Sequence, residues 1–127
     1  MAEVNSRTPA QQKNVESVKR LFEVIHGDGK DFSVLDEVVA EDYIQHNPLA
    51  GAGREGLRAY FTKLIPLPDS QGVSGIVQVN YIVEGSFVVR QEIRTHGLLI
   101  DIFRAEDGIL LEHWDAYRPE PGTERYQ

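Results

Sequence analysis

Cysteine is absent from the 127 residues of this chain, which excludes disulfide bonds, thiolate catalysis and cysteine-ligated zinc. Basic residues are also scarce: lysine and arginine total 13 against 20 for aspartate and glutamate, which gives a formal net charge of −7. The basic residues are scattered along the chain rather than clustered. Nucleic acid and anionic membrane surfaces are therefore poor candidate partners.

Long apolar runs are missing as well. No stretch approaches the ~18 apolar residues of a membrane span, and the N-terminal segment Met1–Arg7 lacks the apolar region of a secretion signal. We therefore expect a soluble cytoplasmic protein. The length fits one domain over residues 1–127, with an ordered core over residues 8–118, polar termini and room for one cavity. The C-terminal tail carries Tyr126 and could pack across a neighbouring subunit.

The first half of the sequence has the periodicity of helices. Thr8-Pro9-Ala10-Gln11 matches a capping box, with threonine as the cap and glutamine three residues later, and apolar residues follow at helical spacing. Pro66 and Pro68 end the last helical segment. The sequence predicts three helices: one from Thr8 to His26, a short one capped by Asp31 or Ser33 and running through Val39, and one from Gly53 to Leu64.

From Gly75 onward the pattern changes to that of strands. Segments rich in β-branched and aromatic residues alternate with short turns such as Glu106-Asp107-Gly108, and connections this short indicate an antiparallel meander. The predicted strands are Ile76–Val83, Phe87–His96, Leu98–Arg104 and Ile109–Tyr117. Helices followed by a run of strands predict an α+β domain, with helices covering one face of a curved antiparallel sheet.

The last two predicted strands place proton-handling side chains among apolar residues. Alternation puts Asp101 on the strand face of Leu99 and Phe103. It groups a second set on one face of the last strand: Ile109, Leu111, His113, Asp115 and Tyr117. Burying an unpaired carboxylate raises its pKa, and a raised pKa lets a carboxylate act as a general base near neutral pH. These segments therefore predict an acid/base site in a cavity.

Several motifs in this order resemble the SnoaL-like polyketide cyclase family of the nuclear transport factor 2-like superfamily. The motifs are Tyr43-Ile44-Gln45-His46-Asn47-Pro48, Gly53-Arg54-Glu55-Gly56-Leu57, Asp101-Ile102-Phe103-Arg104, and Glu106-Asp107-Gly108 before Glu112-His113-Trp114-Asp115. The similarity covers about Asn14 to Tyr117, which is nearly the whole chain.

This resemblance implies an α+β cone, in which a bent antiparallel sheet wraps around the first helix and leaves a deep apolar cavity. It also implies a homodimer packed through the sheet, and ring closure by aldol condensation without a metal or organic cofactor. The acid/base aspartate of the cyclases falls on Asp115. A histidine of the cyclase cavity falls on Asp101, so the sequence departs from the cyclase pattern there.

The expected chemistry is proton removal next to a carbonyl group in a small apolar molecule, leading to cyclisation or isomerisation. Asp115 is the expected base, and raising its pKa by ~2–3 units would cost about 3–4 kcal/mol of differential solvation. His113, with Asn47 or His46, would hold the oxyanion, and Asp101 could stay protonated as a donor. The residues expected to bind the substrate are Tyr43, His46, Asn47, Phe61, Phe103 and Tyr117.

Two other functions stay open at this point. Asp101, Arg90 and Asp115 supply the Asp-Arg-Asp composition of limonene-type epoxide hydrolases, which requires the three side chains to meet around one water. A binding or assembly module without chemistry is the other alternative. A metal site is not expected, because the histidines and carboxylates lack close ligand spacing beyond His113 and Asp115.

Some residues have equally plausible structural roles. Asp101 could pair with Arg90 or Arg104. Trp114 is expected on the face opposite Asp115, packed against helices or a partner subunit. One further strand face is expected to meet solvent or form a polar subunit interface: Arg90, Glu92, Arg94 and His96.

Overall fold

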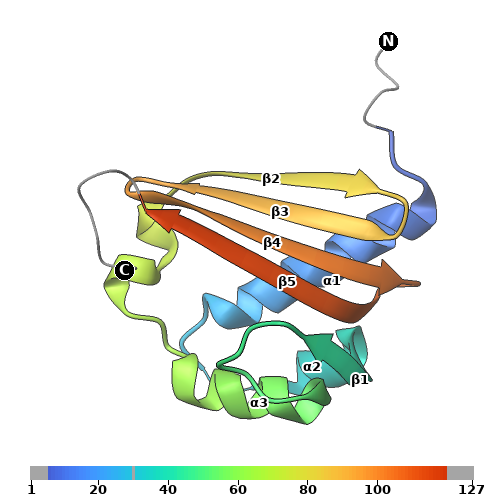
Figure 1. Cartoon of the computed structure of the whole chain (residues 1–127), viewed down its shortest axis with the longest axis horizontal. Coiled ribbons are helices and arrows are strands. Elements are labelled where there is room, and N and C mark those ends of the chain that lie inside the picture. The colour runs from blue at the N-terminus through green and yellow to red at the C-terminus, as the bar shows by residue number, and fades with distance from the viewer. Residues whose placement is uncertain (1–5, 30, 120–127) are drawn as a thin grey trace.

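The computed structural model describes residues 6–29 and 31–119, so the expectation for the tail that carries Tyr126 lies outside the described residues. The elements, shown in Figure 1, are α1 (Pro9–Ile25), α2 (Ser33–Val38), β1 (Val39–Gln45), α3 (Gly53–Leu64), the 3-10 turns η2 (Asp69–Gln71) and η3 (Val73–Gly75), β2 (Ile76–Glu84), β3 (Phe87–Arg94), β4 (Gly97–Glu106) and β5 (Ile109–Pro119). The three predicted helices and four predicted strands are present, and the α+β class is confirmed. In the described part of the chain, no helix is long and apolar enough to cross a membrane.

The sheet has the strand order β1-β5-β4-β3-β2. Strands β2 to β5 form the predicted antiparallel meander, whereas β1 pairs with β5 in parallel. The prediction of a wholly antiparallel sheet is therefore wrong at this edge. The second helix ends at Val38, and Val39 already has the extended backbone of a strand. The parallel pairing places Gln45 beside His113.

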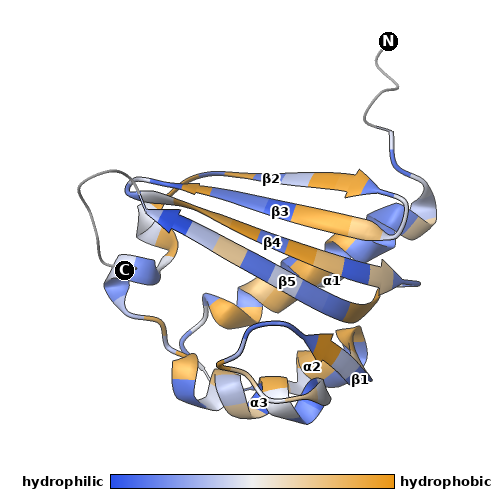
Figure 2. Ribbon diagram, viewed as in Figure 1, coloured by the Kyte–Doolittle hydropathy of each residue, from blue (hydrophilic) through white to orange (hydrophobic). Residues whose placement is uncertain are grey.

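Helix α1 packs beneath the sheet (Figure 1), and Figure 2 shows the alternating apolar and polar bands of an amphipathic helix. The predicted capping box forms: the Gln11 backbone N–H donates to Thr8 Oγ1, and the Thr8 backbone N–H donates to Gln11 Oε1. Two buried polar residues on α1, Asn14 and Ser17, bond the backbone of the β4–β5 turn at Gly108. The helix is thereby fixed against the strands that carry the predicted acid/base residues.

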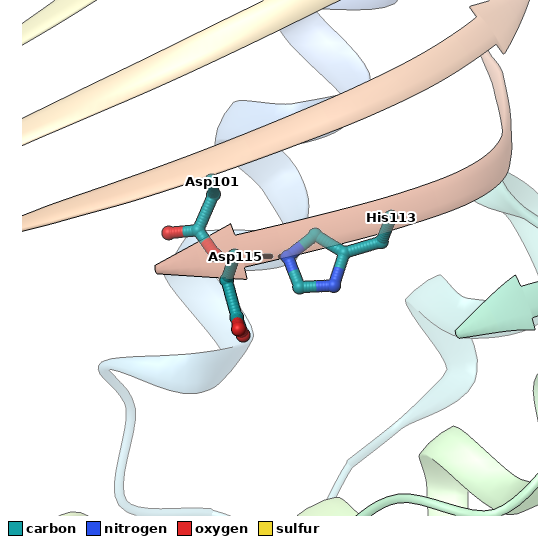
Figure 3. A group of neighbouring side chains, drawn as sticks. All are labelled: Asp101, His113 and Asp115. Carbon is teal, nitrogen blue, oxygen red and sulfur yellow. Dashed lines mark hydrogen bonds and ion pairs between the residues drawn. The ribbon is translucent and has the colours of Figure 1, made fainter. Parts of the chain in front are cut away.

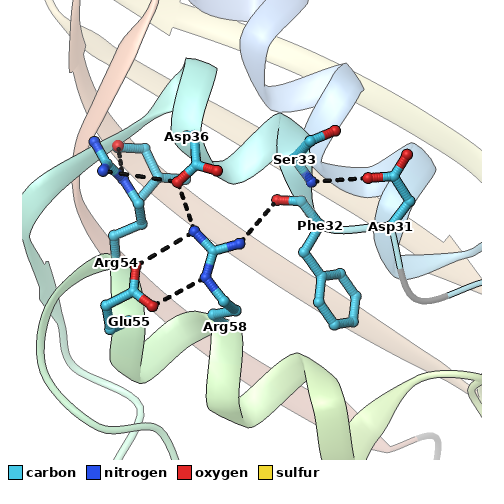
Figure 4. A network of polar contacts seen from close by, with 8 residues as sticks. Asp31, Phe32, Ser33, Asp36, Arg54, Glu55 and Arg58 are labelled. Atoms are coloured by element: carbon cyan, nitrogen blue, oxygen red, sulfur yellow. Dashed lines mark hydrogen bonds and ion pairs between the residues drawn. The ribbon is translucent and has the colours of Figure 1, made fainter.

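An exposed ion-pair network ties α2 to α3 (Figure 4). Arg58 donates to the Glu55 carboxylate, to Asp36 Oδ1 and to the backbone oxygen of Phe32. Arg54 donates to the backbone oxygen of Val39, where β1 begins. The network links the two helices to the start of β1, and α3 presents its apolar face to the interior.

Strand β5 contains a bulge that changes which side chains face inward. Arg104 pairs with Glu112, whereas the next residue of β4 pairs with Leu110, so Leu111 is the extra residue. Leu110 is consequently fully buried in the core. The prediction that Ile109 and Leu111 share the face of His113 is wrong, because alternation alone does not locate a bulge.

Candidate functional site

A cavity of about 250 Å³ lies between α1, α3 and the inner face of the sheet. Its wall is mainly apolar, and the apolar residues are Leu21, Phe22, Ile25, Leu57, Phe61, Leu64, Leu67, Leu99 and Phe103. Asp101, His113 and Asp115 also line it. Strands β4 and β5 place these three together, because Asp101 pairs with Asp115 across the ladder and His113 is two residues before Asp115 on the same face.

Asp101 and His113 form a buried hydrogen-bonded pair, which we call the Asp101–His113 pair. His113 Nε2 lies 2.8 Å from Asp101 Oδ1, and its Nδ1 lies 2.8 Å from Gln45 Oε1 (Figure 3 shows the contact with Asp101). Asp101 is 5% exposed and His113 is 7% exposed. The ring of Phe103 packs against the imidazole with 4.6 Å between centroids. The partner of Asp101 is therefore His113, and neither Arg90 nor Arg104.

The hydrogen bonds of Gln45 fix the proton on one nitrogen of His113. Gln45 Oε1 accepts the backbone N–H of Asn47 at 3.0 Å, and only an oxygen can accept from that donor. The same oxygen faces His113 Nδ1, so Nδ1 must carry a hydrogen. The contact between Nε2 and Asp101 then needs one more proton, on either the carboxyl group or the ring. In both arrangements the pair is neutral overall.

The environment of the second carboxyl oxygen of Asp101 also supports a pair that is neutral overall. Asp101 Oδ2 is buried and has no hydrogen-bond partner among the described residues, which is costly for an ionised carboxylate. Burial raises the pKa of Asp101, and the hydrogen bond from His113 opposes this only in part. The desolvation that the sequence suggested for Asp115 is thus found at Asp101.

Asp115 occupies a different environment from Asp101. It lines the cavity, but its side chain is exposed (Figure 3 shows its carboxyl group beside the pair). Asp101, His113 and Asp115 each offer an atom within 4.8 Å of the others, which among the described residues is a spacing suited to a metal ion. Both ring nitrogens of His113 already hold hydrogen bonds, so a metal ion would have to displace one. The absence of a metal ion from the proposed chemistry stays a prediction.

The cavity also carries hydrogen-bond donors and aromatic rings that the sequence predicted as substrate-binding. These are Tyr43, Asn47, Phe61, Phe103 and Tyr117. Tyr43 is 2% exposed, and burial raises its pKa, as do the charges of Asp101 and Asp115. Its hydroxyl therefore remains a neutral donor over the physiological pH range.

His46 is the one predicted substrate-binding residue that lies outside this cavity, which corrects the prediction. It stacks on Trp114 with 5.0 Å between ring centroids, and its Nε2 lies 2.8 Å from Glu112 Oε2. Gln45 takes the inward position instead, because successive residues of a strand alternate in direction. Treating Val39–Gln45 as a strand would have identified Gln45, since it shares a strand face with Tyr43.

A row of buried charges on β3 also differs from the prediction. Arg90, Glu92 and Arg94, which we call the Arg–Glu row, are 3%, 2% and 7% exposed, so the expected solvent-facing or interface role is wrong for them. Both arginines donate to the Glu92 carboxylate. Glu92 and Arg94 line the cavity.

Arg90 is held away from the cavity wall. It also donates to the Tyr81 hydroxyl at 3.2 Å, and its guanidinium lies 3.8 Å from the ring centroid of Phe22. Although Arg90 points inward, it is not among the residues that line the cavity with Asp101 and Asp115. Arg90, Asp101 and Asp115 are cross-strand neighbours in one row of the sheet, as the epoxide hydrolase alternative requires. The Arg90 guanidinium is bonded to Glu92 and Tyr81 rather than to either aspartate, which does not favour a water held by all three side chains.

We expect that Gln45→Leu will no longer hold the ring hydrogen of His113 on Nδ1. The change leaves the His113 Nδ1–H and the Asn47 backbone N–H without their acceptor, at a cost of about 1–3 kcal/mol in stability. Ring ¹⁵N chemical shifts should show a protonated Nδ1 in the wild type and a mixture of protonation states in the variant. Gln91→Leu is the matched control, since it removes an amide that bonds Asn80 on β2. An unchanged His113 spectrum in Gln45→Leu would contradict the assignment.

Comparison with known proteins agrees with this architecture. A family model described as a SnoaL-like domain matches residues 18–122. A structure described as a proposed SnoaL-like polyketide cyclase from Jannaschia sp. CCS1 is similar at 23% identity and a TM-score of 0.64, over 88% of this chain and 90% of that chain. An NTF-2 like protein of unknown function from Burkholderia xenovorans LB400 is similar at 15% identity and a TM-score of 0.65, over 90% and 88%.

TsrD from Streptomyces laurentii is similar at 25% identity and a TM-score of 0.53, over 80% of this chain and 88% of that chain. No functionally curated protein matches the chain. The fold of these neighbours is that of the chain, whereas their low identity leaves the chemistry to be argued from the cavity.

Proposed function

The chain belongs to the SnoaL-like domain family, and from this premise we propose that it is an enzyme acting without a cofactor on a small apolar carbonyl compound. The reaction begins with removal of a proton next to the carbonyl group and continues to aldol cyclisation or isomerisation. One observation carries the proposal: an exposed carboxylate, Asp115, stands in an apolar cavity beside the neutral Asp101–His113 pair. Two acid/base groups in such different environments are suited to opposite roles.

Asp115 is the base in this proposal. Its oxygen accepts the α-proton of the substrate as the C–H bond breaks. The Asp101–His113 pair gives its shared proton to the carbonyl oxygen, so the electron pair of the C–H bond ends in an enol. The pair is left as an Asp101 carboxylate beside a neutral His113, with no proton between them until the enol returns one. The Tyr43 hydroxyl donates a further hydrogen bond to the oxygen.

The second half of the reaction restores both groups. In an aldol closure, the enol carbon attacks a second carbonyl group, whose oxygen takes the proton from Asp115. The enol hydroxyl returns its proton to the Asp101–His113 pair as the first carbonyl group reforms. In an isomerisation, Asp115 delivers the proton to a different carbon instead. The Asp101–His113 pair suits the acid role because it enters the reaction holding a proton, the one shared between Asp101 and His113 Nε2.

Deuterium uptake tests the proposal. The wild-type protein is incubated in heavy water with a panel of ketones and 1,3-dicarbonyl compounds, and loss of the α-proton signals is followed by NMR. We expect exchange above the buffer rate for at least one compound. Glu112→Gln is the matched control because it changes a carboxylate on the same strand that bonds His46 and Arg104 outside the cavity. Exchange at the buffer rate for every compound would contradict the proposal.

We propose further that the enzyme is a homodimer packed through the outer face of the sheet. The register aligns Ile82, Val89, Ile102 and Trp114 in one row across four strands. Ile82 is 52% exposed, and Phe87, which contacts Trp114, is 42% exposed. Exposed apolar surface of this kind supports association. Light scattering should give twice the chain mass for the wild type and the single chain mass for Ile82→Glu; a monomeric wild type would contradict it.

A further inference from the structure

The cavity contains a second polar region, separate from the acid/base residues. Glu92, Arg94, His26 and Gln71 line it. Arg94 pairs with Gly97 on β4, whereas the partner of Asp115 is Asp101. Gly97 and Asp101 are four residues apart on β4, which corresponds to about 13 Å along the strand. One end of a substrate in the cavity can therefore contact the acid/base residues while its other end contacts Arg94.

This second region has an excess of positive charge. The Arg–Glu row contains two guanidinium groups, which are always charged, and one carboxylate. Burial by itself raises the pKa of Glu92, but the hydrogen bonds from Arg90 and Arg94 outweigh it and lower the pKa. Burial lowers the pKa of His26, so this imidazole is neutral at pH 7 and adds no charge. The Arg–Glu row therefore has one positive charge that no carboxylate within the row balances.

The nearest acid/base group does not supply the missing negative charge. The Asp101–His113 pair is neutral overall, as the hydrogen bonds of Gln45 require. Asp115 is exposed, and it pairs with Asp101, which is four residues along β4 from the partner of Arg94. Because an unbalanced charge in an apolar wall is unfavourable, the region is better solvated by an anion than by a neutral ligand.

Arg94 is held in a fixed position for such a contact. Its Nη1 donates to Glu92 Oε2, and its Nη2 donates to the backbone oxygens of Ser70 and Gly72. These three acceptors are fewer than the N–H groups of a guanidinium. An arginine that is already ordered loses little entropy on binding, and its remaining N–H groups can donate charge-assisted hydrogen bonds to a carboxylate.

We propose that Arg94 binds a carboxylate group of the substrate, so that the substrate is an apolar carbonyl compound with an acidic group at the end opposite its reacting carbonyl. The identity of the reaction rests on the proposed function, whereas the carboxylate preference is a property of the cavity and is measurable without turnover. The apolar middle of the substrate lies against Phe22, Leu99 and Phe103 between the two polar regions.

Calorimetric titration with 2-naphthoate and its neutral analogue 2-naphthamide tests the proposal. We expect the wild type to bind the carboxylate at least tenfold more tightly than the amide, with the ratio falling as salt is added. Arg94→Gln should reduce the ratio to about one. Arg20→Gln is the matched control: it removes the same charge from an exposed pair with Glu37 and should keep the wild-type ratio.

Glu92→Gln should change the ratio of the two affinities in the opposite direction from Arg94→Gln. It removes the negative charge of the row without removing Arg94, so the preference for 2-naphthoate should increase. This variant and the wild-type ratio keep the proposal testable if Arg94→Gln does not fold. Equal binding of the two compounds, tighter binding of the amide, or no binding of 2-naphthoate would overturn it.

These outcomes are separable from the test of the reaction. A carboxylate preference without any α-proton exchange would contradict the proposed function alone. Exchange of ketones without a carboxylate preference would contradict the Arg94 subsite alone.

Discussion

Replacing Asp115 by asparagine is expected to reduce catalysed α-proton exchange by about 10²–10⁴-fold, the range that general acid/base groups contribute. The amide keeps the shape of the side chain but cannot accept the proton. Because the Asp115 side chain is exposed, the free energy of unfolding should stay within about 0.5 kcal/mol of the wild-type value. The measurements are exchange rates by NMR and unfolding by urea on the same preparations.

Ligand binding should be nearly unchanged in Asp115→Asn, since the apolar wall and the Arg–Glu row are untouched. The control is Glu112→Gln, which should exchange at the wild-type rate. An exchange rate in Asp115→Asn equal to that of the wild type would show that Asp115 is not the base. Equal losses in both variants would point to an effect on the fold of β5.

The Asp101→Asn variant should lose activity and gain stability at neutral pH, a combination typical of a functional group held in an unfavourable environment. The asparagine Nδ2–H can donate to His113 Nε2, which is free to accept because Nδ1 carries the ring hydrogen. The variant therefore keeps the hydrogen bond and removes the acid. We expect a loss of about 10²-fold or more in exchange, and a gain on the order of 1 kcal/mol in stability.

The stability gain should depend on pH in a defined direction. The pKa of Asp101 is raised in the folded protein, so the folded state holds this proton more tightly than the unfolded state does. That contribution is fully present below the ordinary carboxyl pKa and is lost as the pH rises through the raised pKa. The difference between Asp101→Asn and the wild type should therefore be smallest near pH 4 and grow toward pH 8.

Urea unfolding of both proteins between pH 4 and pH 8 measures this difference. Asp115→Asn is measured in parallel, because it removes an exposed carboxylate from the same cavity without changing the buried pair. A loss of several kcal/mol in Asp101→Asn at neutral pH would contradict a protonated Asp101 and indicate that the shared proton is on His113, as in a buried ion pair.

The sequence predicted the helices and the meander because their signals are local. The capping box at Thr8, the prolines after α3 and the short turns between strands each act over a few residues. The resemblance to the family correctly implied the fold, and the family match over residues 18–122 establishes it. Alternation also placed Asp101 and His113 on inward faces of neighbouring strands.

The parts that were missed depend on contacts between distant segments. Strand β1 exists because it pairs in parallel with β5, a pairing that the sequence of Val39–Gln45 does not specify by itself. Gln45 was missed for this reason, and His46 was placed in the cavity instead. The bulge at Leu111 reversed the expected facing of its neighbours.

The Arg–Glu row was missed for a different reason. Its strand alternates polar and apolar residues, and the usual interpretation puts the charged face in solvent. Here the charged face is inside because Arg90 and Arg94 share the Glu92 carboxylate, and the backbone of Ser70 and Gly72 takes up further donors of Arg94. Burial of charge requires such partners, and a single sequence does not show them.

The pH dependence of deuterium exchange by the wild type is the most direct test of whether Asp115 and the Asp101–His113 pair act as separate base and acid. We expect a bell-shaped profile, because exchange needs one deprotonated and one protonated group, and a fall at alkaline pH as the pair loses its proton. The alkaline fall should be absent from the residual exchange of Asp101→Asn, which has no such proton to lose. A wild-type profile that only follows hydroxide concentration, as in buffer, would contradict the account.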